Sequence, residues 1–326
     1  MNPSHTYSCR PWPLMPALFL MALFSACESV LEFDDSDLQP FVVVNALPST
    51  DSLFFANVTY SRLFIDNQPF QPVSDAIVTL DVNGTTLHST GTDGANHLFN
   101  YRPAAGDSLT LHVVVPGYEP ITGSTRQVAL PDMQPPVAEI DTLQPITLGN
   151  ITFTLTDPAG TDNFYHIYIL EHDSGSRWNA WTEAWDTIDT VIHCYFQCLN
   201  AEVTVPEVNA TQGMLYYFNQ LLITDSLING QSPELTLSVM MLRDTAEHPL
   251  QRQYTLIVES LSPEAYRYRT ELIQAQGAGQ YLSEPMRLYS NLSSGAGIFA
   301  AIARRQYHLT FTYVNGERRR GAPRLY

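Results

Sequence analysis

Residues 76–88 read Ala-Ile-Val-Thr-Leu-Asp-Val-Asn-Gly-Thr-Thr-Leu-His. Strand-forming residues precede Asn83-Gly84, and a second short stretch of strand-forming residues follows it. Asn-Gly between two such stretches is the strongest short-range signal for a β-hairpin, because both turn residues must take positive φ. We therefore predict a two-stranded hairpin at this point, as part of a larger β-sheet structure.

Strand-like segments recur at close spacing on both sides of this hairpin. About seven short strands within roughly 90 residues are typical of a β-sandwich. The order of the segments and turns also resembles that of prealbumin-like sandwiches, which implies a spacer or docking module. We predict an N-terminal prealbumin- or immunoglobulin-like β-sandwich over residues 39–130, with strands at 41–44, 54–60, 76–82, 85–88, 97–101, 108–115 and 124–130.

Residues 131–136 contain three prolines and are predicted to be a linker, because proline breaks strand ladders and helices. Residues 137–326 then form a second, larger β-rich domain with one helix near 262–276. Ser262 suits the N-cap of that helix, Pro263 its first position and Glu264 its positive first turn. The predicted fold is mainly β, with two β-sandwich-like domains in series.

The N-terminus is predicted to be a lipoprotein-type signal peptide, residues 1–26. An apolar run over residues 14–26 is too short to span a bilayer and ends in Phe24-Ser-Ala-Cys27, which resembles the lipobox of bacterial lipoproteins. That resemblance implies lipidation of Cys27 and anchoring to the membrane without a transmembrane helix. The alternative is cleavage at another bond, which would leave Cys27 as an ordinary thiol.

An acidic segment, residues 27–38, follows the proposed anchor and is predicted to be a tether. Two interpretations remain open for its carboxylates: a solvated spacer, or an address for the outer face of the outer membrane. The segment therefore leaves open whether an anchored protein would face the periplasm or the cell surface.

The chain of 326 residues has 16 Lys plus Arg and no lysine among them, against 33 Asp and Glu, for a net charge of −17. The absence of lysine excludes the lysine of a phosphate-binding loop and Schiff-base chemistry. An acidic chain is also a poor binder of nucleic acid, so we expect neither a nucleotide nor a nucleic-acid partner. The charge is uneven, with −23 over residues 27–261 and +5 over residues 262–326, so the C-terminal segment is a candidate for docking on an acidic surface of this chain or of a partner.

Cys194 and Cys198 are the only cysteine pair of the predicted folded part. In an oxidising compartment a short disulfide is the first interpretation, and it requires a turn or bulge between the two residues. Free thiols are the second interpretation. A zinc site with His193 is the third, although no fourth ligand lies at a usable spacing.

Trp178, Trp181 and Trp185 are all the tryptophans after the signal peptide, at spacings of three and four residues. On a helix they would share one face, where they are candidates for contact with a ligand or partner. The alternative is packing of this segment onto the sandwich.

No catalytic motif is present in the sequence, neither Gly-x-Ser-x-Gly nor His-Glu-x-x-His nor a calcium loop. The acidic residues around Glu171-His172-Asp173 and Glu183 form no signature pair, so they are expected to be solvated surface charges. We accordingly predict no catalytic residue, no metal, no cofactor and no enzymatic activity.

Six further segments stand in order along the chain: 42–45, 75–80, 165–168, 224–231, 260–266 and 291–299. Together they resemble domain-of-unknown-function family forty-two forty-nine, a family of outer-membrane lipoproteins. The resemblance implies an outer-membrane location and an accessory role beside a TonB-dependent transporter in nutrient uptake. It leaves a surface structural or adhesive lipoprotein as the alternative, and a glycan or peptide hydrolase as a third.

Overall fold

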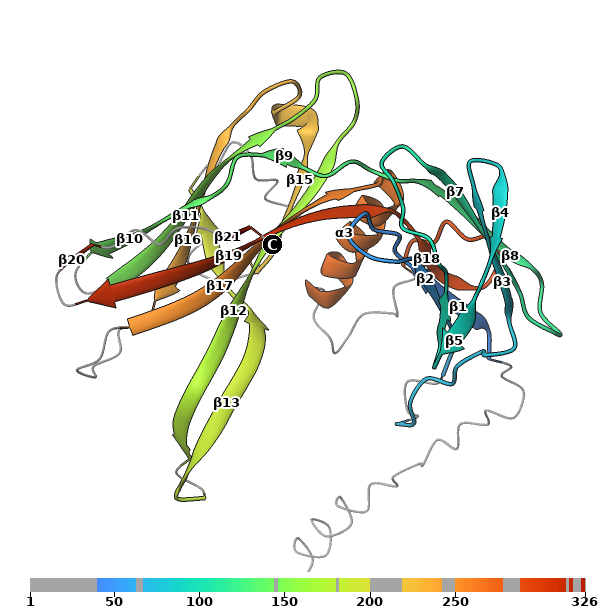
Figure 1. The fold of residues 1–326 in the computed structure, drawn as a ribbon, viewed down its shortest axis with the longest axis horizontal. Helices are drawn as coiled ribbons and strands as arrows, with labels where there is room; N and C mark the ends of the chain where they lie inside the picture. The colour runs from blue at the N-terminus through green and yellow to red at the C-terminus, as the bar shows by residue number, and fades with distance from the viewer. Residues whose placement is uncertain are drawn as a thin grey trace, which may run out of the picture. The chain divides into compact units, whose positions relative to one another are not determined.

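The computed structural model describes most of the chain from residue 40 onward (Figure 1). The described residues are 40–62, 67–143, 146–179, 182–199, 219–241, 250–277, 288–314, 317–318 and 324–325. They form one compact unit that is mainly β with one α-helix, which confirms the predicted fold class. The predicted signal peptide and tether lie outside the described residues. None of the described helices is both long and apolar enough to cross a membrane.

The N-terminal part contains two sheets around a shared apolar core. Their facing residues include Val44, Leu80 and Leu111, all essentially inaccessible to solvent. One sheet has the order β18-β1-β2-β6-β5 and the other β4-β3-β7-β8. The bounds are β1 Val42–Ala46, β2 Phe55–Tyr60, β3 Ile77–Val82, β4 Thr85–His88, β5 Gly91–Asp93, β6 Asn96–Leu98, β7 Ser108–Val114, β8 Ile121–Arg126 and β18 Ala296–Phe299.

The hairpin predicted around Asn83-Gly84 is formed by β3 and β4. Val82 pairs with Thr85 across the turn, and Asn83 and Gly84 have φ of 51° and 86°. Both turn residues thus take the positive φ that the Asn-Gly dipeptide predicts. The Asn83 side chain also accepts a hydrogen bond from the backbone N–H of Ser108 at 2.9 Å, which ties the turn to the start of β7.

Strand β18 comes from the far end of the chain and joins the N-terminal sheet. It lies parallel to β1, with Val44 opposite Gly297 and Ala46 opposite Phe299. The sequence predicts a single strand from about residue 298 to 311, but the structure has two: β18, then a break at Ala300 and Ala301, then β19 Ile302–Val314 in another sheet. The N-terminal sheet therefore includes residues far beyond the boundary predicted at 130.

The C-terminal part consists of two more sheets, with a second apolar core formed by buried residues of both. One has the order β10-β11-β16-β14, with β9 paired to β11; the other has the order β13-β12-β17-β19-β20, with β15 on β12 and β21 on β19. The bounds are β9 Asp132–Met133, β10 Val137–Leu143, β11 Ile146–Thr156, β12 Phe164–Asn179, β13 Ala184–His193, β14 Phe196–Cys198, β15 Leu221–Thr224, β16 Glu234–Met241, β17 Leu250–Leu261, β20 Glu317–Arg318 and β21 Arg324–Leu325, with a short 3-10 helix at Asp225–Leu227.

The predicted linker at 131–136 is not wholly a free connection, because it contains the short strand β9. Met133 pairs with Leu155 of β11 and is buried in the C-terminal core. Asp132 and Met133 keep their backbone N–H groups between the flanking prolines, so this dipeptide is able to pair with the neighbouring strand where the prolines are not.

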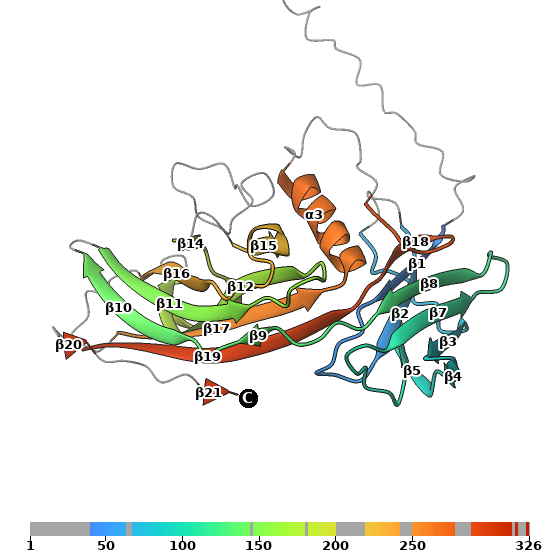
Figure 2. The ribbon, with the colours of Figure 1, turned by 90° about the horizontal axis from the view of Figure 1, so that it is seen from above.

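The single α-helix, α3, runs from Pro263 to Gly277, as predicted. The Ser262 hydroxyl accepts a bond from the Ala265 N–H at 3.4 Å, and it also accepts one from the Ala301 N–H at 3.2 Å. Figure 2 shows α3 on one side of the strands β12 and β17 and next to β18. The N-cap serine therefore joins the start of the helix to the segment between β18 and β19.

Candidate functional site

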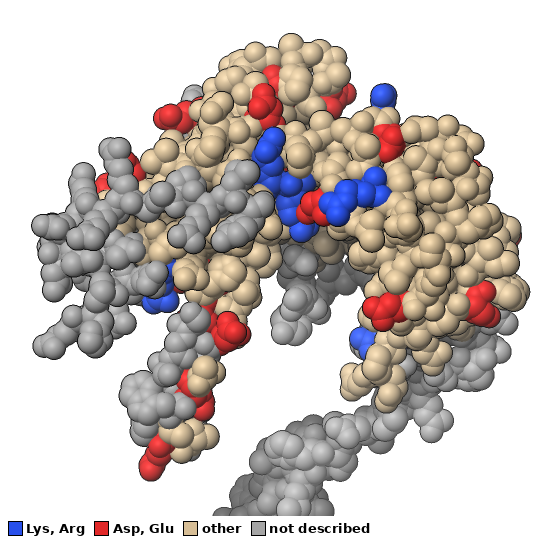
Figure 3. Space-filling model, in the orientation of Figure 1, with Lys and Arg blue, Asp and Glu red and all other residues tan. Residues whose placement is uncertain are grey.

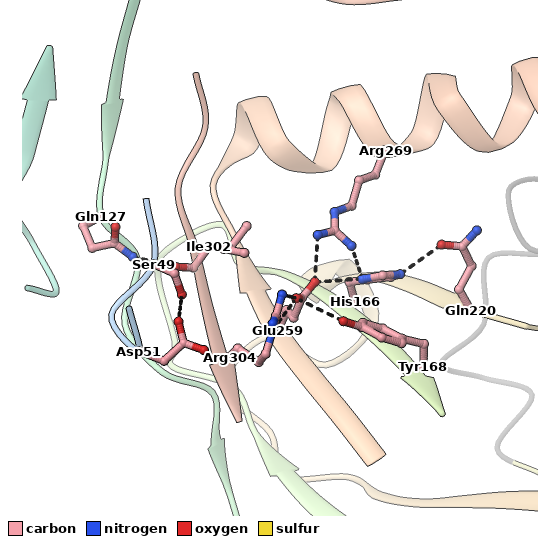
Figure 4. Close-up of polar contacts among 10 residues, drawn as sticks. All are labelled: Ser49, Asp51, Gln127, His166, Tyr168, Gln220, Glu259, Arg269, Ile302 and Arg304. Carbon is pink, nitrogen blue, oxygen red and sulfur yellow. Dashed lines mark hydrogen bonds and ion pairs between the residues drawn. The ribbon is translucent and has the colours of Figure 1, made fainter. Parts of the chain in front are cut away.

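A buried carboxylate lies where α3 meets the sheet. Glu259 is on β17, is wholly inaccessible to solvent and contacts two arginines (Figure 4). Arg304 on β19 donates from Nε and Nη2 to Oε1 at 2.9 and 2.8 Å, and Arg269 on α3 donates from Nη2 to Oε2 at 2.9 Å. The strands and the helix thus each contribute one charge to a single cluster.

His166 on β12 completes this cluster, which we call the Glu259 cluster (Glu259, His166, Arg269, Arg304, Tyr168 and Gln220). Its Nδ1 lies 2.9 Å from Glu259 Oε2 and also contacts Arg269, while its Nε2 lies 3.0 Å from Gln220 Oε1. The Tyr168 hydroxyl donates a long bond to Glu259 Oε1 at 3.5 Å. Every polar atom of the Glu259 side chain therefore has a partner within the chain.

The electrostatics of the cluster fix its charge. Burial opposes ionisation of Glu259, but the bond to His166 and the charges of Arg269 and Arg304 together lower its pKa to about 2. Burial lowers the pKa of His166, and burial with the charge of Glu259 raises the pKa of Tyr168 to about 12. These groups keep one protonation state near neutral pH, which suits holding α3 on the sheet and does not suit proton transfer.

Sequence reasoning did not find this cluster. A usable signal was present: Glu259 is the only charged residue in the largely apolar stretch Tyr254–Leu261, and an acid in a buried strand needs a partner. His166 is similarly flanked by Tyr165 and Ile167, which are both buried. His166 lies 93 residues before Glu259 and Arg304 lies 45 residues after it, so the sequence did not indicate which side chains would pair with this carboxylate.

Trp178 and Trp185, two of the three tryptophans singled out in the sequence, lie on strands and not on a helix. Trp178 is near the end of β12 and Trp185 is near the start of β13, and the two residues are direct partners across this antiparallel pair. The helical arrangement is therefore wrong for these two residues, and Glu183, between them, has a positive φ of 50°. Trp181 lies outside the described residues.

Cys194 lies between β13 and β14, and Cys198 ends β14. Cys194 is a buried thiol that donates to its neighbour's carbonyl, Tyr195 O, at 3.5 Å, and burial raises its pKa to about 12. The predicted disulfide is not formed in the structure and stays a prediction for the protein in an oxidising compartment. In the part of the chain that is described, no three His, Cys, Asp or Glu residues are grouped to hold a metal ion. Cys27 lies outside the described residues.

These features define a class of protein: a mainly β chain of paired sheets, with one helix held on a sheet by a buried carboxylate and two arginines. The chain belongs to the family described as Domain of unknown function (DUF4249), whose model matches residues 28–308. That match confirms the resemblance drawn from the sequence. No curated protein matches the chain.

Proposed function

We propose that the protein is an outer-membrane lipoprotein, anchored through lipidated Cys27, that binds a partner and has no catalysis of its own. The partner is a TonB-dependent transporter, and the complex serves nutrient uptake. The lipobox at Phe24-Ser-Ala-Cys27 supports the anchor. The acidic segment 27–38 then spaces the folded unit from the membrane.

The observation that carries the binding role is the hairpin of β12 and β13. Strand β12 pairs with β17 only as far as His172, whereas its pairing with β13 continues to Asn179. Among the described strands, the last seven residues of β12 therefore pair with β13 alone, as Figure 1 shows. Beyond His172 this stretch of β12 has one edge to which no described strand pairs, and an unpaired strand edge is where another protein adds a strand of its own.

The Glu259 cluster supports a role without catalysis. Its carboxylate is wholly buried, and its charge is already balanced by Arg269 and Arg304. A general acid or base needs a pKa near the working pH, whereas the pKa of Glu259 is about 2. The cluster is therefore best assigned to the architecture.

A surface adhesive lipoprotein is the second candidate. Apolar cross-strand pairs lie exposed on the outer faces of both N-terminal sheets: Ile77 with Val114, and Phe55 with Leu98. Exposed apolar patches mark surfaces that bind other molecules. This candidate requires that whole cells bind matrix or host material through these two faces.

Two measurements test the proposal. Labelling with radioactive palmitate is expected to mark the wild type in the outer-membrane fraction, and the Cys27→Ser variant is expected to lose the label and the membrane association. Affinity capture from solubilised membranes through a C-terminal tag is expected to recover a TonB-dependent transporter. Repeated capture without any transporter, while whole cells still bind matrix material, would favour the adhesive candidate.

A further inference from the structure

We propose that one end of the N-terminal part rests on the bilayer surface and inserts Phe41 and Phe70 between the headgroups and the acyl chains. It is the end at which the chain enters the fold from the proposed lipid anchor. We call it the tether end (Phe41, Arg62, Phe70, Ile77 and Val114). The inference rests on the proposed lipidation of Cys27, and it adds a noncovalent contact that orients the folded unit on the membrane.

The pairing of β1 with β2 brings the two phenylalanines to this end. Val42 opens β1 and lies opposite Tyr60, the last residue of β2, so Phe41 lies just beyond the pair. The Tyr60 N–H donates to Gln71 O at 2.9 Å, which places Phe70 at the same end of the sheet. Phe41 and Phe70 are therefore both close to the point at which the chain enters β1.

The second N-terminal sheet ends at the same place. The Tyr118 hydroxyl donates to Pro40 O at 2.9 Å, and the Tyr118 ring centroid lies 5.7 Å from that of Tyr60. Tyr118 follows β7, whose last residue, Val114, lies opposite Ile77 at the start of β3. Both sheets therefore contribute residues to the tether end.

Four large apolar side chains are exposed at the tether end. The exposed fractions are 52% for Phe41, 56% for Phe70, 64% for Ile77 and 42% for Val114. Apolar side chains gathered on a surface mark a place that contacts another molecule or a membrane. The Arg62 guanidinium lies 4.5 Å from the centroid of the Phe70 ring. A cation on a long apolar stem beside an aromatic ring suits the boundary between lipid and water.

The length of the chain before the fold selects the bilayer as the occupant. Twelve residues separate Cys27 from Pro40. Pro40 therefore lies within about 45 Å of the lipidated residue even if this segment is fully extended. The segment sets the range over which the folded unit stands off the bilayer, and contact at the tether end is the near limit of that range. Attachment at this range raises the effective concentration of the bilayer, so weak apolar contacts are sufficient.

The charge of the tether end favours apolar insertion over recognition of anionic headgroups. Exposed Asp75 and Glu119 stand next to this end in the sequence and offset the single cation, Arg62. In Figure 3 the described residues of the N-terminal part present scattered charged side chains of both signs on the face drawn. An anionic lipid is attracted by a cluster of cations, which this end does not offer. A neutral phospholipid surface is therefore enough for the contact.

The test places a photo-crosslinking amino acid, p-benzoylphenylalanine, at single phenylalanine positions of the full-length lipoprotein in phosphatidylcholine vesicles. Positions 41 and 70 belong to the tether end. Position 55 is the matched control, because Phe55 is also exposed, at 46%, and begins β2 at the opposite end of the same sheet. Mass spectrometry measures the phospholipid attached after irradiation. We expect roughly tenfold or more lipid adduct at positions 41 and 70 than at position 55, because an inserted ring lies among acyl chains.

The outcomes separate this inference from the proposed anchor. Equal lipid yields at the three positions would overturn the inference, while labelling of the wild type with palmitate would still support the anchor. A wild type that takes up no palmitate would reject both. In native membranes, crosslinks from position 70 to a protein instead of to lipid would assign the tether end to a partner and overturn the inference.

The lipid composition tests the nature of the contact. Replacing part of the phosphatidylcholine by phosphatidylglycerol should not raise the yields at positions 41 and 70, because the tether end has no excess of cations. A yield that appears only with phosphatidylglycerol would mean that charge makes the contact, which contradicts apolar insertion.

A pair of double variants gives an independent readout. Phe41→Ser with Phe70→Ser should retain the fold, because both side chains are more than half exposed. On vesicles, backbone amides near residue 70 and in the turn 115–118 should exchange hydrogen several-fold faster in this variant than in the wild type. The matched control, Phe55→Ser with Leu98→Ser, changes an exposed cross-strand pair away from the tether end and should keep the wild-type rates. Unchanged exchange in the first variant, with its palmitate retained, would contradict the proposal.

Discussion

Glu259 is fully buried, and its two arginines keep partial contact with water, with 22% and 34% of their side chains exposed. Replacing it by glutamine removes the negative charge and leaves Arg269 and Arg304 close together without compensation. We expect Glu259→Gln to lower the free energy of unfolding by about 3 kcal/mol, near the lower end for a broken buried pair, since the arginines are able to rehydrate. Urea unfolding followed by circular dichroism measures the difference.

The matched control is Glu171→Gln. Glu171 lies 3.5 Å from Arg252, and their side chains are 20% and 27% exposed, respectively. The pair lies next to His172, where the pairing of β12 with β17 ends. Partly solvated pairs of this kind contribute less than about 1 kcal/mol. If both variants lost the same stability, the cluster would have no special role in holding α3.

Lowering the pH is expected to destabilise the protein in two steps, the first from protonation of His166 and the second from protonation of Glu259. The pKa of His166 is depressed in the folded state below its ordinary 6.5, so its neutral form is favoured and stability is lost as the pH falls below 6.5. The pKa of Glu259 is about 2 against an ordinary 4.5, so its contribution is present above pH 4.5 and is lost as the pH falls toward 2. The stability gap between wild type and His166→Gln should therefore narrow between pH 7.5 and 5.

The corresponding gap for Glu259→Gln should stay constant between pH 7.5 and 5.5 and narrow only below about pH 4.5. Chemical unfolding of the three proteins across this pH range measures both gaps. A gap for Glu259→Gln that already narrows near pH 6.5 would contradict the assignment of the lower window to this carboxylate.

At the scale of elements, the glycines before and within β18 allow two backbones to approach closely. Gly297 has φ of 109°, and a Cβ there would lie 2.0 Å from Val44 O of β1. Gly297→Ala is expected to cost about 3 kcal/mol or more, since strain at positive φ adds to a clash with backbone that has no room to move. Thermal unfolding of the variant measures the loss.

Gly84→Ala separates the two causes. Gly84 also has a positive φ, of 86°, but no atom lies within 4 Å of the position of its Cβ. This change should cost about 1 kcal/mol, from backbone strain alone. Equal losses at positions 84 and 297 would mean that β18 does not need the close approach to β1.

The elements that were predicted from the sequence are those specified by local residues. The Asn83-Gly84 turn and the Ser262-Pro263-Glu264 start of α3 each depend on neighbouring residues, and both are confirmed. The pairing of β18 with β1 joins residues about 250 positions apart, and residues 294–297 indicate a close backbone turn without naming the partner strand. The spacing of Trp178 and Trp185 is compatible with a helix and with a hairpin, and the local sequence does not distinguish the two. The pairing of β12 with β17 and β13 makes this segment a hairpin.

At the scale of the whole molecule, the two parts of the described chain are joined by more than the segment around residue 131. Strand β18 completes the N-terminal sheet and leads through Ala300 and Ala301 into β19 of the C-terminal sheet. The buried side chain of Gln127 donates to the carbonyl of Ile302 at 2.6 Å, which adds a second connection. The N-terminal sheet therefore depends on a strand that the C-terminal part supplies.

This arrangement predicts that the two parts unfold together. Phe299 ends β18, is fully buried and packs against Phe54 with ring centroids 6.2 Å apart in the N-terminal core. Phe299→Ala should cost about 4 kcal/mol, as truncation of a buried aromatic does. Because β18 leads directly into β19 through Ala300 and Ala301, hydrogen exchange should lose protection by the same amount in β7 of the N-terminal part and in β17 of the C-terminal part. Loss confined to β7 would instead mean that each part opens alone, as two sandwiches in series would, and that the link through residues 300–301 transmits no stability.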